Sequence, residues 1–317
     1  MGNFVEPSDH RALAGRRVLV LGASGFLGRW VARLLTRSGA DVHASVRDPE
    51  RSAAIFDRWG VRATVHAVDL SQEAEVSRMF ARVEPAVTFN LVGYGVGREE
   101  RAEHPSTILN ARLPEWLAGS LRPGMDLVHV GSALEYGAAG GDLRESTACR
   151  PTTLYGRTKL EGTLAVARVA ALRTVTARVF TVYGAGERSG RLLPSLVDAA
   201  AGSGEIALGP GTQRRDFLYV EDAAEGLIRL ACAPGRSGEI VNLATGKLTS
   251  VREFALAAAR LLGVDEERLR FGALPMRPDE MNHEPVRIDR LREWLGWSPP
   301  ADLEAGLARA LAWRRET

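Results

Sequence analysis

The stretch Val18-Leu-Val-Leu-Gly-Ala-Ser-Gly-Phe-Leu-Gly28 decides the fold. Its apolar start predicts a strand buried on both faces, as in a parallel sheet. Three glycines then follow at three-residue intervals, and residues 29–36 have the composition of a helix. Glycines at such a turn let the chain reverse tightly, approach a pyrophosphate and pack the helix against the strand. Because glycines punctuate many ordinary turns, the strand and helix on either side carry the argument for a dinucleotide cofactor. The residues expected to contact it are Gly22, Ser24, Gly25, Phe26, Leu27 and Gly28.

The composition excludes several classes of protein. With 317 residues the chain is long for one domain, and 45% hydrophobic and 25% charged residues are ordinary for a soluble globular protein. The net charge of +2 gives no reason to expect nucleic acid or an anionic membrane as partner. Cys149 and Cys232 lie far apart, without metal-ligand spacing, so we expect reduced thiols, no metal and a cytoplasmic location. No signal peptide and no apolar run of about twenty residues is visible, so no membrane span is expected.

Strand and helix patterns alternate along the first 180 residues, which demands right-handed crossovers and a parallel sheet covered on both faces. We therefore predict an α/β fold with a doubly wound parallel sheet. The expected strands cover residues 18–21, 41–46, 61–68, 86–92, 126–131 and 175–180, and the expected helices residues 29–36, 50–59, 73–83, 106–121 and 154–172. Pro114 is placed to kink or restart the fourth of these helices.

After Tyr183 the pattern changes. Loops, glycine-rich turns and a short strand surround a helix at 192–201, and helices at 221–231 and 250–262 with a strand at 239–243 look like a return to the sheet. Further helices are expected to end at Leu295 and to cover 303–314. We therefore expect a dinucleotide-binding domain of residues 1–181, with 217–262 returning to it, and a smaller substrate-binding lobe of residues 182–216 and 263–317.

The end of the second strand bears on the choice of cofactor. An acidic residue there suits the ribose hydroxyls of NAD, whereas a positive group suits the 2′-phosphate of NADP. Val46 stands where the acid would be, and Arg47 follows it, so NADP(H) is favoured and NAD(H) remains an alternative. Arg47 would otherwise only pair with Asp48 at the surface. Asp69, after the third strand, is placed either to meet the adenine or to shape a strand-end turn.

Tyr155 and Lys159 open the helix at 154–172, and their i, i+4 spacing puts both on one face. An ammonium beside a phenol favours the phenolate, so we expect Lys159 to lower the pKa of Tyr155 from about 10 towards neutrality. Such a tyrosine exchanges a proton with a carbonyl or an alcohol. Ser132 ends the fifth strand, where parallel sheets place their ligand crevice, and would hold the substrate oxygen. The alternative for Ser132 is a cap at the strand end.

Together these motifs resemble those of the extended short-chain dehydrogenase/reductases, the branch of nucleotide-sugar epimerases, dehydratases and 4-ketoreductases. The resemblance runs from about residue 17 to residue 314. It rests on the glycine turn and on segments 131–137, 151–159, 178–184, 211–222 and 277–280. It implies catalytic roles for Ser132, Tyr155, Lys159 and, on a looser match, Asn110. It also implies Leu70 and Val92 as further cofactor contacts and Thr181, Arg215 and Arg277 as substrate contacts, the two arginines gripping a diphosphate.

Departures from the family pattern narrow the activity. The dehydratases of the family carry an acidic pair directly after the catalytic Ser or Thr, and here Ala133 and Leu134 stand there, which disfavours dehydration. The fourth strand ends in Asn90-Leu-Val-Gly-Tyr-Gly95 instead of the family's His-Leu-Ala-Ala. We predict an NADPH-dependent reductase of a nucleotide-linked 4-keto-sugar, acting as a homodimer. The alternatives are an epimerase that retains NAD, a reductase of a non-sugar ketone, and a catalytically idle dinucleotide-binding regulator.

Overall fold

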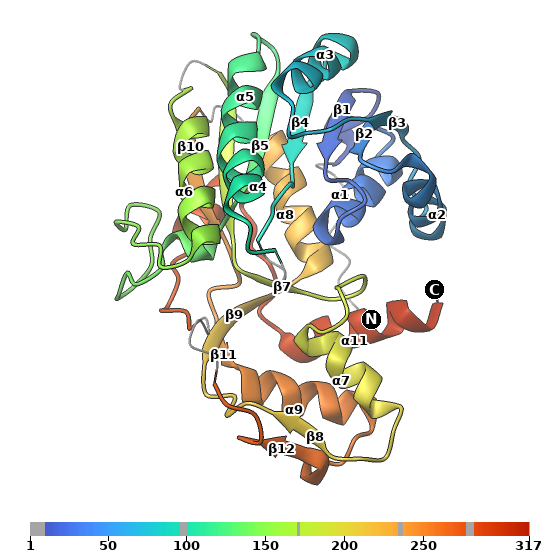
Figure 1. Ribbon diagram of the computed structural model, residues 1–317, viewed down its shortest axis with the longest axis vertical. Coiled ribbons are helices and arrows are strands. Elements are labelled where there is room, and N and C mark those ends of the chain that lie inside the picture. The colour runs from blue at the N-terminus through green and yellow to red at the C-terminus, as the bar shows by residue number, and fades with distance from the viewer. Residues whose placement is uncertain (1–9, 96–99, 170–171, 234–236, 277–281, 317) are drawn as a thin grey trace.

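The computed structural model describes residues 10–95, 100–169, 172–233, 237–276 and 282–316. Within them, a seven-stranded parallel sheet forms the upper part of the molecule, in the order β10-β6-β5-β4-β1-β2-β3 (Figure 1). The strands are β1 (Arg17–Leu21), β2 (Asp41–Val46), β3 (Thr64–Ala67), β4 (Val87–Asn90), β5 (Asp126–Ser132), β6 (Thr174–Val179) and β10 (Glu239–Leu243). The predicted α/β class with a doubly wound parallel sheet is confirmed.

Both faces of this sheet are covered by helices, because β1 is apolar on both sides. Val18 and Val20 belong to one buried cluster, and Leu19 and Leu21 to another. The first cluster lies under α1 (Phe26–Arg37), α2 (Pro49–Trp59) and α8 (Val220–Cys232). The second lies under α3 (Glu73–Val83), α5 (Leu113–Ser120) and α6 (Leu154–Ala167). The order in which strands are added to the sheet reverses between β1 and β4. Open parallel sheets bind their ligands in the crevice outside the carboxyl ends of the strands at such a point.

The segment expected as one helix over 106–121 is divided into three. It contains α4 (Glu103–Thr107), a π-helical turn η2 (Ile108–Arg112) and α5. In the π-turn the Leu113 N–H donates to the carbonyl of Ile108, five residues back. Pro114 explains the irregularity, since it has no N–H to offer the carbonyl of Asn110 four residues earlier. Three other predicted elements are clearly shorter than expected: α6 ends at Ala167, β3 covers only residues 64–67, and β4 covers only residues 87–90.

The lower part of the molecule holds two small sheets. One has the order β11-β9-β7 and the other pairs β12 with β8. Their strands are β7 (Thr181–Tyr183), β8 (Ile206–Leu208), β9 (Arg214–Tyr219), β11 (Leu248–Ser250) and β12 (Leu269–Phe271). Around them lie α7 (Leu192–Ala200), α9 (Val251–Leu262), the short turn η4 (Glu266–Arg268) and α11 (Leu303–Glu316), while α10 (Asp289–Leu295) packs on β10. The expectation that the helix at 250–262 returns to the large sheet is wrong, because α9 packs against α7 and α11 (Figure 1).

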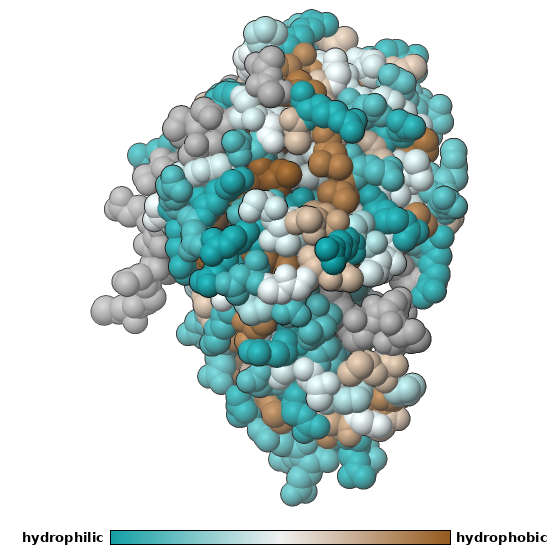
Figure 2. Space-filling model, turned by 90° about the vertical axis from the view of Figure 1, so that its left-hand side faces the viewer, coloured by the Kyte–Doolittle hydropathy of each residue, from teal (hydrophilic) through white to brown (hydrophobic). Residues whose placement is uncertain are grey.

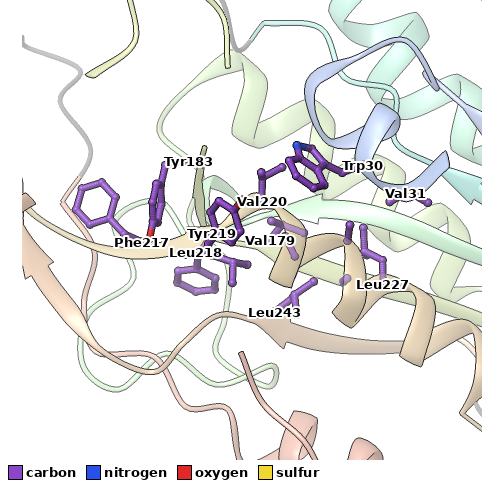
Figure 3. Packing of buried hydrophobic residues seen from close by; sticks show 14 of the residues in the cluster. Trp30, Val31, Val179, Tyr183, Phe217, Leu218, Tyr219, Val220, Leu227 and Leu243 are labelled. Carbon is purple, nitrogen blue, oxygen red and sulfur yellow. The ribbon is translucent and has the colours of Figure 1, made fainter. Parts of the chain in front are cut away.

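A continuous apolar core joins the two parts. Figure 3 shows it running from Val31 and Leu227 beside the large sheet, through Val220, to Tyr183 and Phe217 of the small sheet. At the joint three indoles pack together, those of the buried Trp30 and Trp59 and of the partly buried Trp313. Their ring centroids lie 4.8–5.2 Å apart, so the last helix is fastened to α1 and α2. Among the described helices, none has the length and apolarity needed to span a membrane.

Candidate active site

The glycine turn between β1 and α1 has the geometry that a dinucleotide requires. Gly22 adopts φ +77°, and a Cβ atom on Gly28 would lie 2.0 Å from the carbonyl oxygen of Gly22. Only glycine therefore allows α1 to pack this closely on the turn. Gly25 is the N-cap residue of α1 and provides no side-chain cap, and no acid stands in the first turn. The first N–H groups of α1 are left for an anionic ligand, which fits a cofactor pyrophosphate.

The other residues expected in this turn surround it. Ser24 is half-buried and its carbonyl, with that of Gly25, accepts hydrogen bonds from the Arg29 guanidinium at 3.1 and 3.0 Å. Phe26 and Leu27 pack against the buried cluster and anchor the start of α1. Arg29 was not singled out from the sequence, although its position four residues after Gly25 is the spacing of one helical turn.

Arg47 follows β2 and Asp69 follows β3, and the contacts at these two strand ends bear on the roles predicted for both residues. Arg47 is exposed, while the Asp48 side chain accepts from the Arg51 N–H at 3.0 Å and caps α2. Asp69 accepts from the N–H and hydroxyl of Ser71, which lowers its pKa, and the nearby charge of Arg47 lowers it further. Asp69 thus shapes a strand-end turn, and Arg47 stands beside it at the rim of the sheet.

Of the two apolar residues expected as further cofactor contacts, Val92 lies at the crevice between β1 and β4. A Cβ atom on Gly22 would lie 3.5 Å from a methyl group of Val92, so the glycine turn and the end of β4 are adjacent. Leu70 is buried in the cluster under α3. The backbone N–H of Val92 donates to the Asn90 side chain at 3.2 Å, which fixes the course of the chain as it leaves the sheet.

Ser132 fills the cap role that was one of its two predicted roles, and its hydroxyl also faces the reactive tyrosine. It ends β5, and its Oγ accepts from the backbone N–H of Leu134 at 3.2 Å as the cap of a short turn, η3 (Ala133–Glu135). The same hydroxyl lies close enough to the phenol of Tyr155 to lower the pKa of that phenol. Because the cap contact uses an oxygen lone pair, the Ser132 proton stays available to a second oxygen.

Tyr155 lies at the start of α6 against the loop that follows β4. A Cβ atom on Gly93 would lie 3.5 Å from its hydroxyl, and one on Gly95 3.2 Å from its ring. The departure of this loop from the family pattern therefore has a physical reason, since the missing side chains leave space for the tyrosine ring. Gly95 also has φ +106°, a conformation that only glycine adopts readily.

The expectation that Lys159 lowers the pKa of Tyr155 towards neutrality is wrong for this structure. Burial raises the pKa of Tyr155 above its usual value, and the negative charges of Glu135 and Glu100 raise it further. The Ser132 hydroxyl and Arg191 oppose this rise without reversing it. Lys159 is itself buried, and desolvation lowers its pKa to about 8, so it still carries its positive charge for the most part at neutral pH. Its ammonium donates to the Val92 carbonyl oxygen at 3.4 Å.

Asn110 is fully buried at the centre of the π-turn and contacts the reactive helix from behind. Its Nδ2 donates to the Tyr94 carbonyl at 2.7 Å and to Thr158 Oγ1 at 3.0 Å, and its Oδ1 accepts from the Tyr94 N–H at 2.9 Å. Its backbone carbonyl faces α6, where a Cβ atom on Gly162 would lie 2.1 Å away. Asn110 thus touches neither the Tyr155 nor the Lys159 side chain through these bonds, and instead positions the Tyr94 loop and α6.

Two of the residues expected to meet the substrate, Thr181 and Arg215, lie on strands of the lower part. Thr181 begins β7, and its buried Oγ1 has no hydrogen-bond partner among the described residues. Arg215 lies on β9, close enough to lower the pKa of the buried His283. Arg277 lies outside the described residues.

One buried residue of the site was not assigned a role from the sequence. Glu135 is fully buried and accepts from the Ser132 N–H, from Thr163 and from Arg178. The signal was present, since Ser132-x-x-Glu135 has the spacing of a capping box. Its ion-pair partner Arg178 is 43 residues away, so no local pattern could reveal the pair.

Comparisons with known proteins agree with this geometry. The model of the "NAD dependent epimerase/dehydratase family" matches residues 18–244. A "dTDP-6-deoxy-L-talose 4-dehydrogenase (NAD(P)(+))" of Kitasatospora kifunensis is 31% identical over 300 residues, covering 90% of this chain and 92% of that protein. A "Probable dTDP-4,6-dihydroxy-2-methyloxan-3-one 4-ketoreductase" of Streptomyces antibioticus is 30% identical over 269 residues, covering 83% of each chain.

Among solved structures, MoeE5 in complex with UDP-glucose and NAD aligns with a TM-score of 0.81 and 27% identity. The alignment covers 94% of this chain and 98% of that one. With the family model spanning more than half of the residues and the glycine turn, the strand-end serine and the Tyr-x-x-x-Lys helix all present, the chain belongs to the NAD-dependent epimerase/dehydratase family, the extended short-chain dehydrogenase/reductases.

Proposed function

We propose that this protein reduces the 4-keto group of a nucleotide-linked deoxysugar to a hydroxyl, using NADPH. The observation that carries the proposal is the position of Ser132, at the end of β5, near the phenol of Tyr155, which lies against the loop after β4. Because burial keeps the Tyr155 phenol protonated, it is suited to give a proton to a carbonyl oxygen. The two relatives described above, a 4-dehydrogenase and a 4-ketoreductase of dTDP-linked sugars, support the reaction class.

Each residue has a distinct part in this scheme. Bound in the crevice, the coenzyme supplies the hydride. Ser132 orients the substrate oxygen, Tyr155 donates the proton, and Lys159 supports the phenol from one turn further along α6. Asn110 holds the helix that bears them. Thr181, Arg215 and Arg277 contact the substrate, the arginines at its diphosphate.

Dehydration is disfavoured by the residues beside Ser132. Ala133 and Leu134 occupy η3, and neither can remove or donate a proton. Reduction and epimerisation use the same serine, tyrosine and lysine, so only the choice of coenzyme distinguishes the two activities. Arg47 at the end of β2 favours an exchangeable NADPH, whereas an epimerase would retain NAD.

The decisive experiment measures net coenzyme turnover. Purified protein would be mixed with NADPH and a dTDP-linked 4-keto-6-deoxyhexose, and separately with NADP⁺ and dTDP-6-deoxy-L-talose. Loss or gain of the reduced nicotinamide absorbance in proportion to product supports the proposal. Tightly bound NAD together with C4 interconversion of a UDP-sugar, without net coenzyme turnover, would instead identify an epimerase. Reduction of simple ketones but of no nucleotide sugar would favour the reductase of a non-sugar ketone.

We further propose that the dinucleotide-binding and substrate-binding parts act across the crevice, and that the chain forms a homodimer. The side that carries α6 shows hydrophobic side chains among polar ones (Figure 2), and Leu164 of α6 is 44% exposed. Sedimentation equilibrium tests this, with Leu164→Glu expected to favour the monomer. A wild-type monomer at micromolar concentration would contradict the homodimer.

A further inference from the structure

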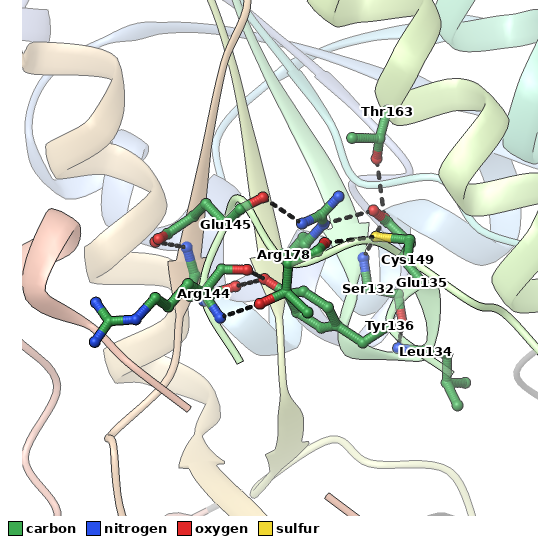
Figure 4. Close-up of polar contacts among 11 residues, drawn as sticks. Ser132, Leu134, Glu135, Tyr136, Arg144, Glu145, Cys149, Thr163 and Arg178 are labelled. Carbon is green, nitrogen blue, oxygen red and sulfur yellow. Dashed lines mark hydrogen bonds and ion pairs between the residues drawn. The ribbon is translucent and has the colours of Figure 1, made fainter. Parts of the chain in front are cut away.

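Glu135 is a buried carboxylate to which the scheme above gives no part. It is fully buried, and both of its oxygens have partners (Figure 4). Oε1 accepts from the Ser132 backbone N–H at 2.8 Å and from the Thr163 hydroxyl at 2.9 Å. Oε2 accepts from the Arg178 guanidinium at 2.8 Å. Every bond goes to a different element of the site.

Those elements are the ones that carry the reactive groups. Ser132 ends β5, and Arg178 lies on the neighbouring β6. Thr163 lies on α6, four residues after Lys159 and eight after Tyr155, which places all three side chains on one face of the helix. The carboxylate therefore fastens the helix that bears Tyr155 to the strand end that bears Ser132.

The surroundings are shaped to admit this group. A Cβ atom on Gly131 would lie 2.6 Å from Glu135 Oε1 and 3.1 Å from Thr163 Oγ1, so no other residue fits at 131 without displacing the carboxylate. The Arg178 guanidinium lies over the ring of Tyr136 at 4.7 Å and donates to the Glu145 carbonyl at 3.3 Å. The Tyr136 hydroxyl in turn donates to Asn242 at 2.7 Å. Several contacts therefore hold the Arg178 guanidinium in place, as others hold the Glu135 carboxylate.

We propose that Glu135 is a positioning residue of the active site: it holds the Ser132 hydroxyl in register with Tyr155 by binding β5, β6 and α6 at once. The inference rests on the proposed function only in so far as Ser132 and Tyr155 act on a substrate. A carboxylate of this kind differs from an ordinary structural group because it also brings a fixed negative charge close to the phenol.

The charges that face Tyr155 come from several elements. Glu135 and Glu100, in the loop after β4, raise the pKa of the phenol, and Arg191, before α7, lowers it. Lys159 lies on the same helix, and its own pKa is raised by Glu135 against the larger effect of burial. Neutralising Glu135 while leaving the other groups in place should therefore make the phenol ionise more readily.

The test compares Glu135→Gln with Thr163→Val. The glutamine keeps an oxygen for Ser132 and Thr163 but removes the charge, whereas the valine removes one hydrogen bond and leaves the charge. We expect kcat to fall by up to about 100-fold in both variants, as for a displaced reactive group, with KM and coenzyme affinity within about twofold. Only Glu135→Gln should shift the Tyr155 ionisation, lowering its midpoint by about one pH unit or more.

The ionisation is read without substrate, by ultraviolet difference titration of the protein with a Tyr155→Phe variant subtracted. It therefore tests the electrostatic part of the proposal even if no nucleotide sugar is reduced. An unchanged midpoint in Glu135→Gln would overturn the electrostatic part of the proposal, and unchanged kcat in both variants would overturn the positioning part. If Glu135→Gln does not fold, the paired change Glu135→Gln/Arg178→Gln leaves no buried charge uncompensated and undergoes the same titration.

Discussion

Asn110 Nδ2 lies 3.0 Å from Thr158 Oγ1, joining the π-turn to the middle of the reactive helix. Thr158 is the residue before Lys159, and its hydroxyl also contacts the carbonyls of Leu154 and Tyr155. The asparagine therefore acts on the backbone that carries the tyrosine. A proline four residues later, Pro114, is what frees the chain to form the π-turn in which Asn110 lies.

Replacing Asn110 with Ala should destabilise the protein and slow the reaction. The change leaves the N–H and carbonyl of Tyr94 without their partner, so we expect the free energy of unfolding to fall by about 1–3 kcal/mol. Urea denaturation and steady-state kinetics measure the two effects. Ser106→Ala is the matched control, because that buried hydroxyl donates only to its own helix, at Ala102. Equal kinetic effects in both variants would argue against a positioning role for Asn110.

Tyr155→Phe should leave binding intact and remove the proton donor. Since the ring that fills the space beside Gly93 and Gly95 is kept, we expect NADPH to bind with nearly unchanged affinity. Turnover should fall by roughly two to four orders of magnitude, as for loss of a general acid. Stopped-flow or steady-state reduction of the nucleotide sugar measures this. Near-normal kcat would mean that Tyr155 only packs in the crevice.

Arg47→Ala should discriminate between the two coenzymes. If the guanidinium binds the 2′-phosphate, its loss weakens NADPH by about 1.5–3 kcal/mol, typical of a hydrogen bond to a charged group, and leaves NADH nearly unaffected. Isothermal titration with both coenzymes measures the difference. Arg51→Ala, an exposed arginine of α2, serves as the control. Equal weakening of both coenzymes by Arg47→Ala would contradict the assignment.

Arg215→Ala should raise the KM of the nucleotide sugar. Loss of a charged hydrogen bond to a diphosphate costs about 1.5–3 kcal/mol, whereas a surface arginine contributes about 0–1 kcal/mol. Titration calorimetry with UDP, dTDP, CDP and GDP identifies which base is preferred, and Arg214→Ala, at the exposed neighbouring position, is the control. Failure of every nucleoside diphosphate to bind would remove the support for a nucleotide-sugar substrate.

His283 should make stability depend on pH. Burial, with the charge of Arg215, lowers its pKa to about 3, and its Nδ1 accepts from the Asp216 N–H at 3.1 Å. In the unfolded chain the pKa is about 6.5, so below that pH the unfolded state binds a proton that the folded state does not. This contribution to stability is present above pH 6.5 and is lost as the pH falls towards 3.

The variant His283→Asn isolates the effect, since the amide oxygen can still accept from Asp216. The free energy of unfolding of the variant, relative to that of the wild type, should rise by up to about 1.4 kcal/mol for each unit by which the pH is lowered between pH 6 and 4. The pH dependence of the wild type alone would not isolate His283, because burial raises the pKa values of Asp216 and Asp222 to about 6. These two groups make the folded state more stable as the pH falls, whereas His283 makes it less stable. A difference between the two proteins that does not change with pH would refute the prediction.

The fold was predictable because its strongest signals are local. An apolar strand followed by the glycine turn at 22–28 identifies the first βα unit, and the alternation that follows leaves little choice of topology. The family was confirmed for the same reason, since its motifs are short and contiguous. The position of α9 was not predictable, because its amphipathic pattern fits the large sheet as well as α7 and α11.

Within the site, the sequence locates Ser132, Tyr155 and Lys159 but not their electrostatics. Whether burial or a neighbouring cation dominates the pKa of Tyr155 depends on distances that no spacing reveals. The same holds for the pair of Glu135 and Arg178, whose members approach only when β5 and β6 lie side by side. Roles assigned to Thr181, Arg215 and Arg277 remain predictions.

The three packed indoles at the joint form an optical reporter. Trp30 follows the glycine turn by two residues, while Trp313 belongs to the last helix. The orientation of the two rings therefore depends on the position of the last helix relative to the glycine turn. Indoles whose centroids are about 5 Å apart couple excitonically, and the Arg33 guanidinium over Trp313 at 4.4 Å adds a nearby charge that affects their emission. A movement of the upper part relative to the lower part would change the near-ultraviolet circular dichroism and the fluorescence of these indoles. Such a movement can therefore be followed in real time without attaching a label.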